Sequence, residues 1–228
     1  MRRRANNADK TKGLQNAVLS WFADHGRDFP WRETSNPFHI FVAEVLLRQT
    51  QATRLAKPYT DLIIKYPSAH ALSQANIEEL RTWFKSIGLI KRADYLVHAA
   101  NILVEKYGGR VPDELDDLMN LPGIGMYSAR AILCLAFNKP FPMVDESSGR
   151  LLRRVFNESS IEPAYSDTGL LQLASTLLRK SSCRELNLGL IDIAALHCRV
   201  KNPRCTPCPL VNVCIYEQRN PTRAERRC

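Results

Sequence analysis

Residues 121–130 read LPGIGMYSAR, a turn with one proline and two glycines between apolar patterns of helical spacing at residues 113–121 and 126–137. Glycine accepts positive φ and has no Cβ, so another backbone can approach such a turn closely. The second helix begins directly after Gly125, and its first N–H groups carry the positive end of the helix dipole. The stretch predicts a helical hairpin able to hold a phosphate, although a plain helix–helix turn is the simpler interpretation of Gly-x-Gly alone.

The same helical spacing continues along almost the whole 228-residue chain. Apolar residues recur every three or four positions, and runs of β-branched residues with a period of two are missing. The pattern therefore predicts an all-α fold. We expect helices at residues 15–22, 38–48, 58–66, 77–87, 91–107, 115–121, 126–137, 149–156, 169–178 and 188–198.

The charge balance favours an acidic polymer as partner. Lys and Arg number 32 against 23 Asp and Glu, a formal net charge of +9, which makes nucleic acid the first candidate. No apolar run approaches the ~18 residues of a membrane span, and the basic N-terminus is not followed by a signal-peptide stretch. We expect a cytoplasmic, nucleoid-associated protein with no membrane partner.

Four cysteines lie within seventeen residues in the segment CRVKNPRCTPCPLVNVC, with the spacing C-x6-C-x2-C-x5-C. Thiolates this close in sequence can close around one metal centre. Structural zinc takes four thiolates, often from two CxxC pairs, and an iron–sulfur cluster also takes four. Spacing alone leaves both open. The predicted ligands are Cys198, Cys205, Cys208 and Cys214.

The hairpin followed by this loop resembles the helix–hairpin–helix DNA glycosylases of the endonuclease III superfamily, over residues 14–214. The segments RDFPWR (27–32), AEVLLRQTQ (43–51) and LPGIGMYSARAI (121–132), and the aspartate of MVD (143–145), are similar to landmarks of its MutY branch. That branch includes adenine glycosylases acting on mispairs with 8-oxoguanine and archaeal thymine glycosylases acting on G·T mispairs.

The resemblance implies two helical domains with the active site in the cleft between them. One is a six-helix barrel at residues 33–140 that contains the hairpin at 113–137. The other joins residues 1–32 and 141–228 and holds a [4Fe-4S] cluster in the loop 198–214. The resemblance also implies a monovalent cation at the hairpin, and a monomer on mismatched double-stranded DNA with a downstream abasic-site endonuclease as a further partner.

Glu44 lies in the apolar segment IFVAEVLL, next to Val45 and Leu46. A buried carboxylate is costly unless it is paired or protonated, and a raised pKa suits a general acid. The alternative is a glutamate on an exposed helix stripe. In the resembled branch this position is the catalytic glutamate.

Asp145 precedes a helical pattern that starts near Ser148, so a helix N-cap is a sufficient structural explanation for it. The resemblance adds the role of catalytic aspartate. A fixed carboxylate stabilises the cationic sugar formed as a base departs. The residues after it, Glu146 and Ser147, depart from the small residue and Asn usual in the family, which puts substrate choice and activity in doubt.

Tyr127 occupies the first turn of the second hairpin helix. In bifunctional members of the superfamily a lysine occupies this position, forms a Schiff base with the sugar and then cuts the strand. A phenol cannot form that imine. We therefore expect base removal by water without efficient strand cleavage, with Tyr127 stabilising the sugar cation or orienting the nucleophile. A core aromatic is the alternative.

Further residues are candidate DNA contacts. Glutamines 49 and 51 match residues that the branch inserts into the duplex when the target nucleotide flips out, although two glutamines at a helix end are also ordinary exposed residues. Phe29 offers an aromatic face for stacking. The candidates are Arg27, Phe29, Arg32, Arg48, Gln49, Gln51, Ala52, Gly123, Gly125, Ser147 and Leu188.

Two of these candidates bear on the choice of base. Leu188 stands where adenine-specific relatives carry Gln or Glu, and Ala52 replaces a bulkier valine. The chain also ends soon after the cysteine loop, whereas adenine enzymes usually add a C-terminal domain. We expect release of thymine, and of uracil, opposite guanine; a MutY-like adenine glycosylase acting opposite guanine or 8-oxoguanine and a non-catalytic DNA-binding protein are the alternatives.

Overall fold

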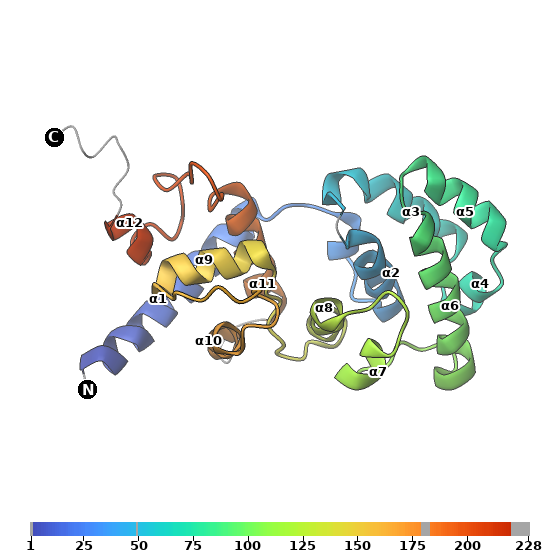
Figure 1. The fold of residues 1–228 in the computed structure, drawn as a ribbon, viewed down its shortest axis with the longest axis horizontal. Coiled ribbons are helices and arrows are strands. Elements are labelled where there is room, and N and C mark those ends of the chain that lie inside the picture. The colour runs from blue at the N-terminus through green and yellow to red at the C-terminus, as the bar shows by residue number, and fades with distance from the viewer. Residues whose placement is uncertain (1, 49, 179–182, 220–228) are drawn as a thin grey trace. The chain divides into compact units, whose positions relative to one another are not determined.

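A computed structural model describes residues 2–48, 50–178 and 183–219 (Figure 1). Every regular element in these ranges is a helix, as the apolar spacing predicts. None of the helices described is long and apolar enough to cross a membrane. The chain divides into two compact units, one formed by Asp28–Lys139 and the other by Met1–Arg27 together with Pro140–Cys228.

The continuous unit is built around α2, whose side chains are apolar on nearly every face. Asn36 caps this helix by accepting hydrogen bonds from the backbone N–H groups of Phe38 and His39, and α2 packs on both α6 and α8. Its elements are η1 (Pro30–Arg32), α2 (Pro37–Leu47), η2 (Ala52–Arg54), α3 (Ala56–Lys65), α4 (Ala69–Ser73), α5 (Ile77–Ser86), α6 (Ile90–Tyr107), α7 (Leu115–Met119) and α8 (Met126–Phe137).

The second unit packs α1 and α9 on α11. Gly189 lets α1 approach α11 closely, because a Cβ at this position would lie 2.6 Å from Cγ1 of Val18. A leucine-rich core fills the space between the helices. The elements are α1 (Arg2–His25), α9 (Glu146–Phe156), α10 (Thr168–Leu178), α11 (Cys183–Leu196) and α12 (Ile215–Arg219).

Several helix boundaries differ from those expected from sequence. Helix α1 begins at Arg2 rather than at residue 15. The periodic pattern missed its first turns because the residues there are mostly polar and form no apolar stripe. Helices α4 and α12 are five residues each, too short to give a periodic signal. Helix α11 begins at Cys183 rather than residue 188.

Candidate functional site

The hairpin turn joins α7 to α8 in the continuous unit, and its two glycines have different structural roles. Gly123 has a φ of +86°, and a Cβ there would lie 3.1 Å from Cβ of Tyr95. Glycine is therefore required by both conformation and space. Gly125 caps α8 with an extended backbone (φ −116°, ψ −179°), and a Cβ there would meet no described atom within 4 Å. The N-terminal end of α8 is thus open to an approaching group.

Two arginine contacts connect this turn to the end of α2, and the end of α2 to α6. Arg48 Nη1 donates to the carbonyl of Gly123 at 3.1 Å, and Arg92 Nη2 donates to the carbonyl of Arg48 at 2.8 Å. Burial and the nearby charge of Arg48 lower the pKa of the Arg92 guanidinium. Two guanidinium groups held this close favour an anion beside them, because its charge offsets their repulsion.

Glu44 lies inside the continuous unit on α2, with 6% of its surface exposed. Burial raises its pKa to about 8, and a hydrogen bond with Ser128 partly opposes that shift. Ser128 is itself buried, on the first turn of α8, directly after the half-buried Tyr127. The Glu44 carboxyl therefore keeps a proton near neutral pH, as a general acid must.

In the second unit, Asp145 is the N-cap of α9, as the sequence predicts. Its Oδ1 accepts hydrogen bonds from the Ser148 backbone N–H at 2.7 Å and the Ser148 hydroxyl at 2.8 Å. The Ser148 hydroxyl oxygen in turn accepts from the Asp145 N–H at 2.9 Å, which completes a capping box. Both of these bonds to the carboxylate use Oδ1, so they fix the orientation of the carboxylate at the start of α9.

The two residues after Asp145 have distinct surroundings. Glu146 is exposed, and its Oε1 accepts a hydrogen bond from the Ala164 N–H at 2.9 Å. Its charge is thus tied to the segment that precedes α10. Ser147 is half-buried in the first turn of α9. Leu188 lies on α11 and is 5% exposed, so it presents a buried apolar surface.

The residues near the end of α1 have structural partners that sequence reasoning missed. Arg27 Nε pairs with Oδ1 of the fully buried Asp192 at 2.6 Å, and the Arg27 N–H donates to Oδ2 at 2.8 Å. In the other unit, the Phe29 ring stacks on Trp31 at 4.9 Å and the Arg32 guanidinium lies 5.3 Å from its centroid. Phe29 is 7% exposed, so little of its ring is open for stacking on a base.

The glutamine pair is described only in part. Gln51 is exposed and precedes η2, and Ala52 is half-buried at its first position. Gln49 lies outside the described residues.

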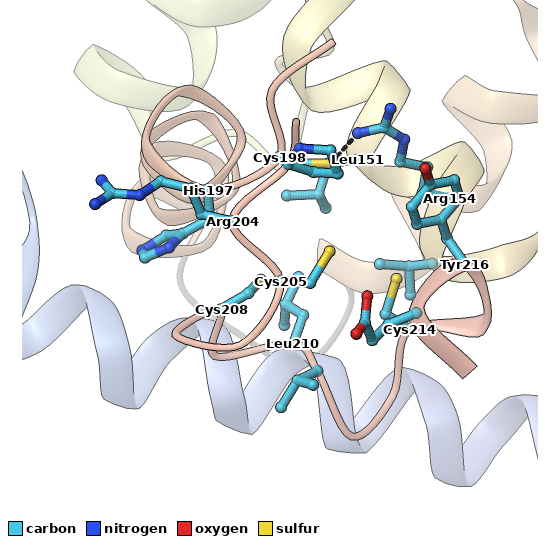
Figure 2. Close-up of a pocket in the computed structure, with 14 residues that line it drawn as sticks. Leu151, Arg154, His197, Cys198, Arg204, Cys205, Cys208, Leu210, Cys214 and Tyr216 are labelled. Carbon is cyan, nitrogen blue, oxygen red and sulfur yellow. Dashed lines mark hydrogen bonds between the residues drawn. The ribbon is translucent and has the colours of Figure 1, made fainter. Parts of the chain in front are cut away.

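All four cysteines of the loop line one pocket in the second unit, together with residues of α9 and α12 (Figure 2). Arg154 on α9 donates from Nη1 to Cys198 Sγ at 3.3 Å and to the Arg199 carbonyl at 2.7 Å. Its guanidinium also lies over the Tyr216 ring, 4.6 Å from the centroid. Sequence reasoning did not single out Arg154, since nothing local distinguishes it from other arginines of α9.

Burial raises the pKa of the Cys205 thiol to about 12 and that of Cys208 to about 11. The buried carboxylate of Glu217 adds to the shift of Cys205. Such thiols ionise when a bound metal supplies the opposing charge. No group of three or more His, Cys, Asp or Glu in the described part of the chain is arranged to hold a metal ion.

Residues 42–172, which include Glu44, the hairpin and Asp145, match the model of the HhH-GPD superfamily base excision DNA repair proteins. The chain belongs to the HhH-GPD superfamily. It is 36% identical to a thymine/uracil-DNA glycosylase of Methanothermobacter thermautotrophicus, over 92% of this chain and 96% of that protein. It is 33% identical to a thymine-DNA glycosylase of Aeropyrum pernix, over 91% and 95% of the two chains.

The fold of this HhH-GPD protein is also similar to that of a solved thymine-DNA glycosylase. The structure of a thermostable thymine-DNA glycosylase superposes with a TM-score of 0.87 at 35% identity, covering 93% of this chain and 99% of that one. The superfamily match contains all three residues expected to take part in catalysis, whereas the four cysteines of the loop and Leu188 lie beyond its C-terminal limit.

The buried Glu44 predicts a specific dependence of stability on pH. The folded carboxyl keeps its proton up to a pKa of about 8, whereas the unfolded one ionises near 4.5. Between these values the folded state binds more protons, so the free energy of unfolding falls as pH rises. Relative to Glu44→Gln, we expect the wild type to lose on the order of a few kcal/mol between about pH 5 and about pH 8.

Denaturant unfolding of both proteins across this pH range measures the effect, because the Gln variant subtracts all other titrations. A difference in unfolding free energy that stays constant with pH would contradict the buried, protonated carboxyl.

Proposed function

We propose that this chain is a monofunctional DNA glycosylase of base excision repair that removes thymine, and uracil, mispaired with guanine. The observation that carries the proposal is the likeness to a thymine/uracil-DNA glycosylase over 96% of that protein's length. The net charge of +9 suits a DNA substrate. The open N-terminus of α8 and the Arg48–Arg92 pair are the groups we propose to hold the DNA backbone.

The proposed reaction begins with extrusion of the mispaired nucleotide, because the glycosidic bond is hidden within the stacked duplex. Glu44 then donates its proton to the departing base. Its burial serves this step, since a carboxyl with a pKa of about 8 still carries a proton at neutral pH. Asp145 stabilises the developing sugar cation through its carboxylate, which the Ser148 cap holds in one orientation. A water molecule then adds to the sugar carbon and releases a proton, which leaves an abasic site.

The proposed base preference rests on the residue type at position 188. Leu188 on α11 has no polar atom to form a hydrogen bond with an adenine edge. An apolar side chain instead suits the C5-methyl group of thymine. Glu146, the unexpected charge next to Asp145, is engaged with the Ala164 N–H, so it does not argue against the same chemistry.

We also propose that the cysteine pocket holds a [4Fe-4S] cluster. The four cysteines of the C-x6-C-x2-C-x5-C spacing all line one pocket. The resembled glycosylases carry such a cluster at this spacing, and a cluster of this kind is commonly held by four cysteine thiolates. Bound there, it would supply the charge that the buried thiols need to ionise and would order the loop between Cys198 and Cys214.

We propose a barrel domain with the hairpin at residues 33–140 and a cluster domain at residues 1–32 and 141–228. The compact units of the structure differ by a few residues, because residues 28–32 belong to the continuous unit.

The substrate proposal predicts the outcome of a duplex panel. Duplexes containing G·T, G·U, A·G and A·8-oxoguanine are incubated with the protein and then cleaved with alkali at abasic sites. We expect release of thymine and uracil opposite guanine to exceed adenine release roughly tenfold or more, because a polar adenine edge would stay unpaired against Leu188. Release of adenine without thymine would overturn the assignment.

The two acidic residues are tested in the same panel. Glu44→Gln and Asp145→Asn should each slow base release about 100-fold or more while DNA binding persists. Turnover equal to wild type in both variants would favour the non-catalytic alternative.

The absence of a lysine at position 127 predicts that no imine forms with the sugar. Borohydride should trap no covalent DNA complex with the wild type. Tyr127→Lys, which places an amine at the start of α8, should yield a trapped complex and strand cleavage. Tyr127→Phe is the matched control, since it keeps the ring and adds no amine. Efficient trapping with the wild type would contradict the monofunctional mechanism.

The cluster proposal predicts a brown protein with about four irons per chain and broad visible absorbance. Elemental analysis of the purified protein measures iron and zinc together. Zinc near one equivalent without iron would refute the cluster. Cys205→Ser should lower the iron content, whereas the same change at Cys134, outside the loop, should not.

A further inference from the structure

Asn187, a buried polar residue of α11 like Asp192, holds the segment that leads into Asp145. Asn187 is 2% exposed, and its side chain bonds three backbone groups. Its Nδ2 donates to the Phe141 carbonyl at 3.1 Å and to the Cys183 carbonyl at 2.9 Å. Its Oδ1 accepts from the Met143 N–H at 2.9 Å. The amide thus ties two points of one loop to α11.

The braced segment has no regular structure of its own. Residues 138–145 form neither helix nor strand, yet Met143 and Val144 are 3% exposed. Buried backbone groups outside helices need other partners, and leaving them unpaired costs free energy. Asn187 satisfies a carbonyl and an N–H two residues apart. A leucine could fill the same space but would leave both groups without this partner.

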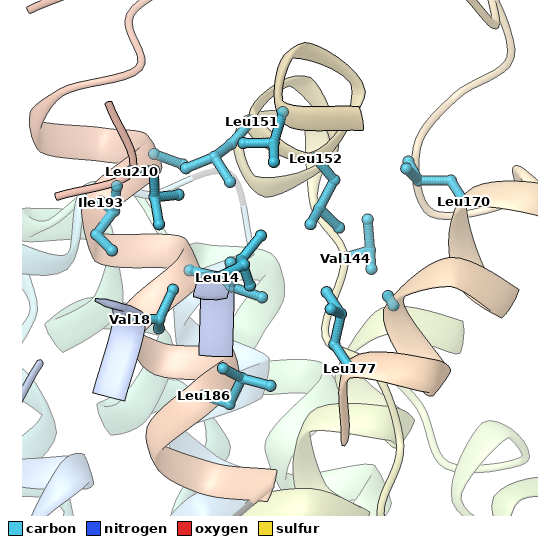
Figure 3. Close-up of a cluster of buried hydrophobic side chains, with 14 of the residues drawn as sticks. Leu14, Val18, Val144, Leu151, Leu152, Leu170, Leu177, Leu186, Ile193 and Leu210 are labelled. Atoms are coloured by element: carbon cyan, nitrogen blue, oxygen red, sulfur yellow. The ribbon is translucent and has the colours of Figure 1, made fainter. Parts of the chain in front are cut away.

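The brace and the core hold the chain directly before Asp145. Figure 3 shows Val144 among the buried side chains of this unit, in a cluster that also contains Leu152, Leu177 and Leu186. Asp145 follows Val144, and the Ser148 capping box holds it from the other side. The position of Asp145 is therefore fixed on both sides along the chain. Asn187 holds the backbone of residues 141 and 143 before it, and Ser148 after it holds the carboxylate.

We propose that Asn187 is a positioning residue for the Asp145 carboxylate. The inference rests on the proposed function, in which Asp145 stabilises the sugar cation. A displacement of about 1 Å at a reacting group can reduce a rate about 100-fold. Asn187 lies next to Leu188, but its amide is engaged with backbone, so it acts on geometry rather than on the base.

The test compares Asn187→Ala with wild type in single-turnover base release from a G·T duplex, together with the Kd for a duplex that carries an abasic-site analogue. We expect the rate to fall about 10- to 100-fold and Kd to change less than about threefold. Asn187→Ser, which keeps one hydroxyl in the site, should give an intermediate rate and provides the comparison if the Ala variant does not fold.

Asp167→Ala is the matched control. Asp167 is also buried and hydrogen-bonded, to Arg153 at 2.8 Å and to the Leu170 N–H at 2.9 Å, but it caps α10 rather than the segment before Asp145. It should lower Tm and leave the rate unchanged at a temperature below every transition. Equal rate losses in the Asn187 and Asp167 variants would show a general structural effect and overturn the proposal.

The Asp145→Asn variant distinguishes failure of the proposed mechanism from failure of the positioning role of Asn187. If this variant releases base at the wild-type rate, the proposed mechanism itself fails. If it is inactive while the Asn187 variants keep the wild-type rate, only the positioning role of Asn187 is overturned.

Discussion

The burial of one carboxyl group, that of Glu44, constrains the packing of α2 against α8 in the continuous unit. An apolar helix can hold such a group only if it stays protonated or finds a partner, and here Ser128 on α8 is that partner. The same helix that carries Ser128 begins at the hairpin glycine Gly125. The proposed proton donor, Glu44, and the proposed backbone-binding turn are therefore connected through one helix pair, and the Arg48 contact to Gly123 is a second connection between them.

In the second unit, α9 has a comparable role. Its N-terminal end is the Asp145 cap, and its C-terminal half carries Arg154, which contacts the cysteine loop. Arg150, between them, donates to the Cys198 carbonyl at 2.9 Å. One helix thus contacts both the cysteine loop and the aspartate that we propose to be catalytic. A cluster bound in the loop, as proposed, would be linked to that aspartate through α9.

Features coded locally could be predicted from the sequence, and those made by distant residues could not. The hairpin, the Asp145 cap and the four thiols in one pocket follow from short spacings, and all are present. The ion pair of Arg27 with Asp192, which is distant in sequence, could not be predicted from local spacing. Likewise nothing in the sequence around Asn187 distinguishes a brace from a surface amide.

The sequence by itself determined the helical class, the superfamily, the buried acid and the lack of a lysine at position 127, because each depends on residue type and near-neighbour spacing. Only the tertiary structure decided which arginines are committed to structure, where Glu146 directs its charge and what holds the chain before Asp145. The reason is that hydrogen bonds and ion pairs of buried polar groups join residues across the fold, and a one-dimensional pattern carries no record of those pairings.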